Sequence, residues 1–337
     1  MFTVDFNELN CNEIAKLFFD EPVVSCNVKN TSHGEADFRE ALIVQLASGS
    51  KFVIKLADNS FTAPDRIRMW QRCAADYRDL GYYTPRILAD KSGEFPTVRY
   101  KGHDCAVYAE DFAKYTYEDA SANGLAASKY FNDILIMTAK VAALHSDYAE
   151  YPSGYCLFEC FAPDDEEEEV LENAWEWKRY AETLPEEFHL LIEEIWTLWN
   201  ENREALNRVY HTLPTSIFQA DLNSSNTLID ENENFVGVFD FNLCGRDVLL
   251  NYAFREIYWY DDEIEIELMR SAVAVMSDFY SFSQVEKDTA LMIYRCVKPL
   301  WYTKLMRLKK AGNDVSAIRT CLEQTRLALT RDIDFFS

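Results

Sequence analysis

The order of β-prone and helical segments constrains the fold of this 337-residue chain more than any other feature. Residues 1–110 carry short β-prone runs separated by polar turns, with one helical segment over residues 64–81. The rest of the chain, residues 111–337, has apolar residues at helical spacing, interrupted by two β-prone runs at residues 226–230 and 235–241. This order predicts an α+β fold with a small antiparallel-sheet lobe followed by a larger, mainly helical lobe.

The charge of the chain limits its partners. It carries 57 acidic and 33 basic side chains, a formal net charge of −24. Such a surface repels phosphate backbones and anionic lipid, so we expect neither nucleic acid nor a membrane as partner. A cationic small molecule would be attracted, although the same acidity is also typical of a protein that is merely soluble. Of the nine cysteines, only Cys156 and Cys160 have zinc-ligand spacing, and they lack a partner pair or a nearby histidine, so the cysteines indicate reduced thiols in a cytosolic protein.

The segment "FQADLNSSNTLIDENENFVGVFDFN", residues 218–242, contains a predicted β-hairpin whose turn is "ENEN". The start of the first strand lies beside the end of the second in an antiparallel pair, so Asn226 and Asp240 should meet. One amide oxygen and one carboxylate suit Mg²⁺, with water and nucleotide phosphates completing its shell. Asp221, on the loop entering the same end, could orient a bound hydroxyl and accept its proton.

The same segment resembles the catalytic loop and metal-binding segment of the aminoglycoside phosphotransferase and choline kinase family, kinase-like enzymes that phosphorylate small molecules. The family pattern is His-x-Asp-x-x-x-x-Asn, then a hairpin, then an apolar-Asp-aromatic triplet. The resemblance implies a protein-kinase-like fold, with Asp221 as catalytic base and Asn226 and Asp240 as magnesium ligands. The chain departs from the pattern at Gln219, where the family has histidine.

A looser resemblance extends over roughly residues 20–255. "SKFVIKL" is similar to the third strand of the small lobe, which implies that Lys55 holds the α- and β-phosphates of the nucleotide. "VYAEDF" is similar to the hinge, whose backbone around Glu110 to Phe112 would face the adenine. The acid that should pair with Lys55 falls near Gln71, which can accept one hydrogen bond but supplies no charge; Asp65 and Asp76 are the alternative partners.

The resemblance implies transfer of a phosphoryl group from ATP or GTP, with Mg²⁺, to a hydroxyl of a small molecule, with amines favoured by the negative charge. A nucleotide-binding pseudokinase without turnover remains the alternative, on the grounds of Gln219, Gln71 and the glycine-poor loop "NTSHGEAD". Retention of all three predicted catalytic-loop and metal residues argues against it. An unrelated α+β binding protein with chance hairpin acids is a further alternative. The sequence does not indicate the oligomeric state.

Two charged segments have two interpretations each. The cluster "REIYWYDDEIEIE", residues 255–267, would offer Tyr258, Trp259, Asp261 and Asp262 as a wall for a cationic substrate, or it begins an amphipathic helix with exposed acids. The acidic run at residues 164–169 is either a lid or a solvated helix start. We favour the helix start in both cases.

Overall fold

The computed structural model describes residues 9–32, 34, 37–118 and 125–337, and it confirms the α+β class. The chain divides into two compact units. The first, here called the sheet unit, comprises Met1–Asp119, Ala162–Asp164 and Ser225–Gly245. The second, the helical unit, comprises Ala120–Phe161, Asp165–Ser224 and Arg246–Ser337. The predicted division lay at residue 110 and left the hairpin with the helices, whereas the hairpin belongs to the sheet unit.

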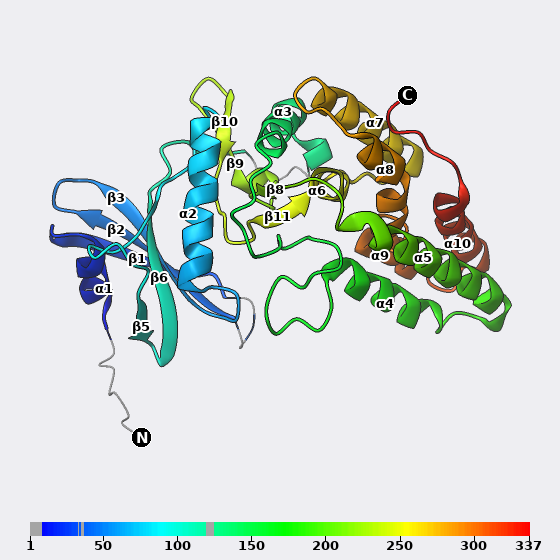
Figure 1. The fold of residues 1–337 in the computed structure, drawn as a ribbon. Helices are drawn as coiled ribbons and strands as arrows, with labels where there is room; N and C mark the ends of the chain where they lie inside the picture. The colour runs from blue at the N-terminus through cyan, green and yellow to red at the C-terminus, as the bar shows by residue number, and fades with distance from the viewer. Residues whose placement is uncertain (1–8, 33, 35–36, 119–124) are drawn as a thin grey trace. The chain divides into compact units, whose positions relative to one another are not determined.

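The sheet unit is built on an antiparallel sheet with strand order β1-β2-β3-β6-β4, and β5 pairs with β6 (Figure 1). The strands are β1 (Val23–Asn30), β2 (Phe38–Leu46), β3 (Lys51–Asp58), β4 (Ile87–Leu88), β5 (Thr97–Tyr100) and β6 (His103–Asp111). The predicted antiparallel sheet of short strands is confirmed. The β-prone segment at residues 82–90 contributes only the two residues of β4, since Pro85 has no amide hydrogen for a ladder.

Successive side chains of a strand point to opposite faces of the sheet, and the two faces differ here. Ile54, Leu56 and Val107 pack on one face with Ile14 of α1 (Cys11–Phe18), a short helix that the sequence analysis did not predict. Lys55 pairs in register with Tyr108 on the opposite face. Helix α2 (Pro64–Asp79) begins and ends as predicted, and its Trp70 ring lies 5.9 Å from that of Tyr108. The Lys55 side chain is therefore on the face that α2 covers.

The predicted hairpin forms as β9 (Thr227–Ile229) and β10 (Phe235–Val238), extended by β7 (Thr116–Tyr117). Two backbone hydrogen bonds join this hairpin to Tyr83, in the segment after α2. The Tyr83 amide donates to the carbonyl of Val236 at 2.7 Å, and the Val238 amide donates to the carbonyl of Tyr83 at 3.2 Å. A Cβ at Gly237 would lie 1.9 Å from that carbonyl oxygen. Only glycine permits this approach, and the approach fixes the strand that leads to Asp240.

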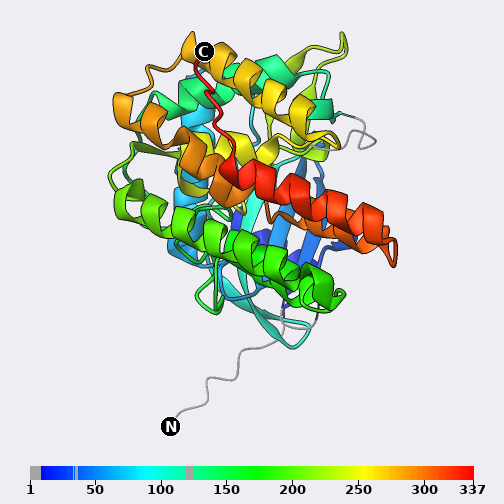
Figure 2. The same ribbon diagram turned by 90° about the vertical axis from the view of Figure 1, so that its right-hand side faces the viewer.

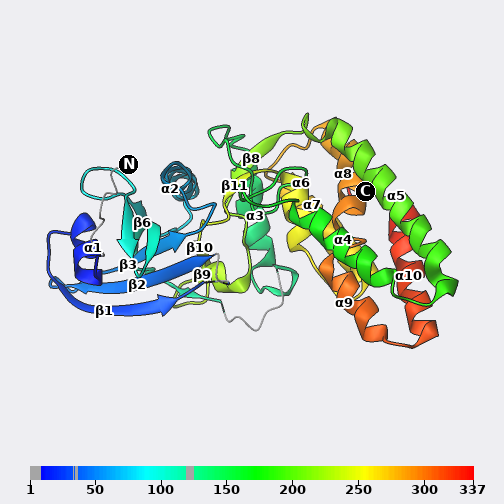
Figure 3. The same ribbon diagram turned by 90° about the horizontal axis from the view of Figure 1, so that it is seen from below.

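The helical unit contains eight α-helices in the part of the chain that is described. They are α3 (Phe131–Ala142), α4 (Glu169–Ala181), α5 (His189–Tyr210), α6 (Leu249–Glu256), α7 (Asp262–Ser277), α8 (Gln284–Val297), α9 (Tyr302–Ala311) and α10 (Val315–Thr330). The long helix α5 packs against α8 and α10 (Figure 2). Helices α4 and α9 also pack together (Figure 3). None of the helices described combines the length and apolar character needed to cross a membrane.

A buried carboxylate anchors the start of α6. Strands β8 (Thr215–Phe218) and β11 (Gly245–Val248) pair, and Asp247 at the end of β11 is fully buried. Asp247 accepts hydrogen bonds from Ser153, Tyr210 and Asn251, at 2.8, 3.2 and 2.8 Å. Asn251 also donates to the carbonyl of Tyr155 at 2.9 Å. A buried carboxylate is stable only when hydrogen bonds satisfy its oxygens. The network therefore holds α6 against the loop that carries Tyr155.

Candidate active site

The sheet unit gathers one lysine and two carboxylates on the α2 side of its sheet. Lys55 Nζ lies 3.0 Å from Oδ1 of Asp240 and 3.3 Å from Oε2 of Glu110. The side chain of Glu110 is only 8% exposed, against 34% for Asp240. An ammonium shared between two carboxylates in partly buried surroundings remains charged and is held at a fixed place.

The pKa shifts of Lys55 and Glu110 agree with this geometry. Burial lowers the pKa of Lys55, but the charges of Asp240 and Glu110 outweigh it, so its pKa is well above the usual value. Burial raises the pKa of Glu110, and the attraction of Lys55 offsets only part of that rise. Lys55 therefore carries its positive charge throughout the physiological range, as a phosphate ligand must.

The partner of Lys55 is not the residue that was predicted. The Gln71 amide donates to the carbonyl of Ile87 at 2.8 Å, and the described contacts of Lys55 are with Asp240, Glu110 and the Tyr108 ring. The expected Gln71–Lys55 hydrogen bond is thus wrong. Glu110 supplies the missing acid from β6, in place of the helix acid of the family pattern.

The predicted hinge begins later than expected. Glu110 is in register with Val53 of β3 and with Ile87 of β4, so its main chain lies inside the sheet. Phe112 follows the end of β6, is 43% exposed, and its amide donates to the carbonyl of Lys51 at 3.3 Å. Main chain that has left the sheet, and could face an adenine, therefore begins after the Phe112 amide and not at Glu110. The loop around Gly34 lies partly outside the described residues.

The end of the hairpin brings Asn226 and Asp240 together, as antiparallel pairing predicts. Thr227 is in register with Val238, and the amide of Phe239 donates to the carbonyl of Asn226 at 3.1 Å. Asp240 has a φ of +62°, a left-handed conformation that is unusual for a residue with a side chain and that is concentrated at functional sites.

The donor set at this end of the hairpin fits a magnesium ion. Asn226 and Asp240 offer an amide oxygen and a carboxylate, and Mg²⁺ is commonly bound by one or two such groups plus water and phosphate oxygens. The described residues contain no group of three or more His, Cys, Asp or Glu side chains that could hold a metal.

The loop of Asp221, which the resemblance implies to be the catalytic loop, lies in the helical unit and is held by Gln219, at the position of the family histidine. Gln219 is fully buried, and its side-chain oxygen accepts the Asp221 amide at 2.8 Å. Ala220, between them, has a φ of +65°. The Asp221 carboxylate in turn accepts a 2.5 Å hydrogen bond from the Asn223 side chain. Gln219 thus takes over the task of shaping the loop, and Asn223 orients the carboxylate.

Asp221 lines a cavity of about 970 Å³ within the helical unit. A volume of that size accommodates a drug-sized molecule. Its wall is rich in aromatic side chains, which are Tyr155, Tyr258, Tyr260, Trp301 and Tyr302. Two further acids also line it: Glu169, at the start of α4, and Glu256, at the end of α6. A carboxylate able to act as a base thus faces a space large enough for an organic substrate.

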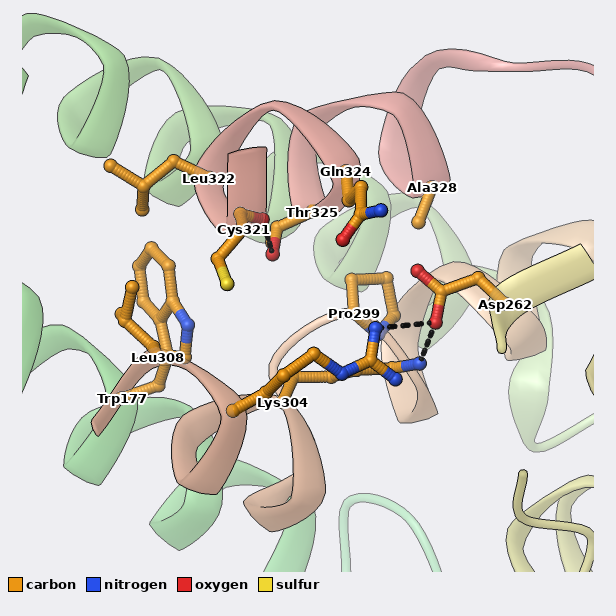
Figure 4. Close-up of a pocket in the computed structure, with 11 residues that line it drawn as sticks. Trp177, Asp262, Pro299, Lys304, Leu308, Cys321, Leu322, Gln324, Thr325 and Ala328 are labelled. Atoms are coloured by element: carbon orange, nitrogen blue, oxygen red, sulfur yellow. Dashed lines mark hydrogen bonds and ion pairs between the residues drawn. The ribbon is translucent and has the colours of Figure 1, made fainter. Parts of the chain in front are cut away.

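The cluster at residues 255–267 agrees in part with each of its two interpretations, a substrate wall and the start of a helix. Tyr258 lines the cavity, as a substrate wall would. Asp261 caps α7, and Asp262 accepts from Lys304 at 2.6 Å and from Arg307 at 3.0 Å (Figure 4). Two cavities adjoin Asp262, with volumes of about 10 and 140 Å³, and both are smaller than the pockets that usually hold an organic ligand. The two aspartates are therefore structural, as the helix-start interpretation requires, but Asp262 is not exposed.

The acidic run also follows the helix-start interpretation, in part. Glu168 caps α4 by accepting the amides of Val170 and Leu171. It is buried and pairs with Arg203 at 2.7 Å, so it is not solvated. Neither this pair nor the place of Glu256 in the cavity was predicted, because local sequence does not show which distant residues meet.

An antiparallel small sheet with one helix on the lysine face, a hairpin ending in Asn and Asp, and an Asp-bearing loop among helices define a kinase-like enzyme. The chain belongs to the phosphotransferase enzyme family, whose model matches residues 32–250. The predicted family and the prediction of an enzyme that transfers phosphoryl groups are confirmed.

Several solved structures share this fold. An amicoumacin kinase in complex with AMP-PNP, Ca²⁺ and its antibiotic has a TM-score of 0.56 and 13% identity, over 95% of this chain and 94% of that chain. The aminoglycoside phosphotransferase from Alicyclobacillus acidocaldarius has a TM-score of 0.54 and 13% identity, over 95% and 96%. A microcompartment-associated aminopropanol kinase has a TM-score of 0.54 and 14% identity, over 94% of each chain. No curated protein matches the chain by sequence.

Proposed function

We propose that this phosphotransferase moves the γ-phosphoryl group of ATP, with Mg²⁺, to a hydroxyl of a small organic molecule. The observation that carries the proposal is that Asp221, held by Gln219 and Asn223, opens onto a cavity of about 970 Å³. Phosphoryl transfer needs positioning and charge stabilisation more than covalent chemistry, and the residues described supply both.

The sheet unit would bind the nucleotide. Lys55 would hold the α- and β-phosphates, and its present partners Asp240 and Glu110 keep it charged and oriented until phosphate replaces Asp240. Asn226 and Asp240 would hold the magnesium ion, which when bound neutralises the charge of the transferring phosphate. The main chain from Phe112 onward would face the adenine.

Asp221 would orient the acceptor hydroxyl and accept its proton as the bond to phosphorus forms. An alcohol needs little activation in a loose transition state, so the main contribution of Asp221 is alignment. The donor is proposed to be ATP, because the fold is shared with an amicoumacin kinase that binds AMP-PNP. No comparable observation favours GTP, and none favours a pseudokinase without turnover.

A screen for phosphate transfer tests the proposal. The protein is incubated with Mg-ATP and, in parallel, Mg-GTP, against aminoglycosides, amino alcohols, homoserine and sugars. Products are identified by a mass increase of one phosphoryl group. We expect a phosphorylated acceptor that forms with ATP and not after EDTA treatment. Binding of Mg-ATP without any phosphorylated product would instead support the pseudokinase alternative.

A further inference from the structure

Glu256 is a half-buried carboxylate whose role in the fold is not evident. It is the last residue of α6 and lines the same cavity as Asp221. It has no hydrogen bond or ion pair with any residue that the structure describes. A partly buried carboxylate without a partner costs free energy, and such a group at the wall of a substrate cavity points to a partner that arrives with the substrate.

The other acid at this wall already has its cation. Glu169 forms an ion pair with Arg255, whose guanidinium is only 6% exposed and lies against the rings of Tyr155 and Trp301. Arg255 is thus fixed by two rings and one carboxylate. Arg255 precedes Glu256 in the sequence, and its charge lowers the pKa of Glu256. The ion pair that Arg255 forms, however, is with Glu169.

The surroundings of Glu256 leave it short of positive charge. Burial, together with the charges of Asp221 and Glu169, raises the pKa of Glu256 to about 7, against the lowering effect of Arg255 and Lys298. Lys298 itself donates to the carbonyl of Ile257 and lies 3.4 Å from Glu265. An additional cation next to Glu256 would therefore stabilise its ionised form.

The cavity as a whole is not strongly acidic, in contrast to the chain. Its described wall has three carboxylates and four basic side chains, the latter being Arg255, Arg307, Lys309 and Lys310. A ligand with many ammonium groups would meet more like than opposite charge there. A ligand with one ammonium group can pair with Glu256, for which the described residues supply neither a hydrogen bond nor an ion pair.

We propose that Glu256 binds the ammonium group of the acceptor, and that the preferred acceptor is an amino alcohol with a single ammonium group rather than a polycation. This inference rests on the proposed function, since it places the acceptor hydroxyl at Asp221. The aromatic side chains Tyr155 and Tyr258 would cover the carbon skeleton between the two polar ends.

A matched pair of probes tests the inference without turnover. 3-Amino-1-propanol and 1-butanol differ only in an ammonium group in place of a methyl group, and their binding is followed by ligand-observed NMR titration. We expect the amine to bind at least about tenfold more tightly than the alcohol. Glu256→Gln should remove most of this preference, while Glu323→Gln, an exposed acid on α10, should leave it unchanged.

The pH dependence provides a second readout that a merely structural role would not produce. The amine stays protonated between pH 6 and 8, so only the ionisation of Glu256 changes its attraction over that range. Given a pKa of about 7 for Glu256, the affinity of the wild-type protein for the amine should rise about tenfold from pH 6 to pH 8. The Gln variant should show no such rise.

The outcomes separate this inference from the proposed function. Equal affinity for the two probes, including no binding of either, overturns the inference. So does an amine affinity that Glu256→Gln leaves intact. In the transfer screen, a polycationic or amine-free best acceptor also overturns it, although the proposed function then stands. Absence of transfer to every acceptor, with the amine preference intact, contradicts the proposed function alone.

Discussion

Lys55 and Asp240 are 185 positions apart in the chain, and the lysine ammonium donates a 3.0 Å hydrogen bond to the aspartate. The pair joins strand β3 to the end of the hairpin within the sheet unit. In the absence of nucleotide and metal, Lys55, the proposed phosphate ligand, and Asp240, the proposed metal ligand, are thus paired with each other. Nucleotide binding would then exchange one ionic contact of Lys55 for another.

Replacement of Lys55 should affect both binding and stability. Lys55→Met leaves Glu110 and Asp240 without their cation, so we expect a loss of about 1–3 kcal/mol in the free energy of unfolding, besides loss of ATP binding. A second change, Glu110→Gln, should restore part of the stability but no ATP binding. Chemical denaturation and nucleotide titration measure the two effects. Lys51→Met, an exposed position on the same strand, is the control; equal effects at both positions would contradict this role of Lys55.

Asp240 should govern the response to Mg-ATP. A ligand at a hundred times its dissociation constant stabilises a fold by about 2.7 kcal/mol, which raises the melting temperature by roughly 2–4 °C. We expect that rise with Mg-ATP for the wild-type protein, and its loss with EDTA or in Asp240→Asn. Glu231→Gln, an exposed acid in the turn of the same hairpin, should keep it. A shift insensitive to EDTA would show that the metal is not held here.

Gly237 should be intolerant of any side chain. In Gly237→Ala the new methyl group would meet the Tyr83 carbonyl oxygen at 1.9 Å, which forces the hairpin away from Tyr83. We expect a loss of about 2–3 kcal/mol in the free energy of unfolding and weaker binding of Mg-ATP, because Asp240 moves with its strand. Gly49→Ala is the matched control. Its φ is +89° but its Cβ meets nothing within 4 Å, so it should cost only about 1 kcal/mol. Equal losses at the two sites would refute the close approach.

Glu256 should make the protein less stable as pH rises. Its folded-state pKa of about 7 is above the ordinary glutamate value of 4.5, so the folded state retains the proton longer. Both states are protonated below about pH 4.5, and the stability present there is lost as pH rises through 7. Glu256→Gln should therefore unfold like the wild-type protein near pH 4 and be more stable by up to about 3 kcal/mol at pH 8. Urea unfolding across this range measures the difference, and a pH-independent difference would contradict the shift.

The parts of the site that depend on local geometry could be predicted from the sequence. An antiparallel hairpin with a short turn brings the start of its first strand to the end of its second, so the approach of Asn226 and Asp240 follows from spacing, apart from the register shift between Phe235 and Gly237. The boundaries of α2 follow from Pro64 and Gly81, which mark a helix start and stop. These signals are carried by neighbouring residues.

The parts that depend on pairing between distant segments could not be predicted. Glu110 reaches Lys55 because β3 and β6 are adjacent and Val53 is in register with Glu110, which the sequence of neither strand specifies. The sequence analysis placed the partner of Lys55 near Gln71 because the family pattern puts that acid on the helix, whereas Glu110 lies on a strand. Glu256 reaches the cavity through the anchoring of α6 by Asp247, a contact network assembled from four segments. Tertiary contacts decide such positions.

The most direct test of the account compares wild-type protein with Asp221→Asn in a phosphate-transfer assay with Mg-ATP and the best acceptor of the screen. Loss of the base and of its alignment should lower the transfer rate by about 10²–10⁴-fold. The rise in melting temperature with Mg-ATP should be unchanged. Equal transfer by the two proteins would show that Asp221 is not the residue that faces the acceptor hydroxyl.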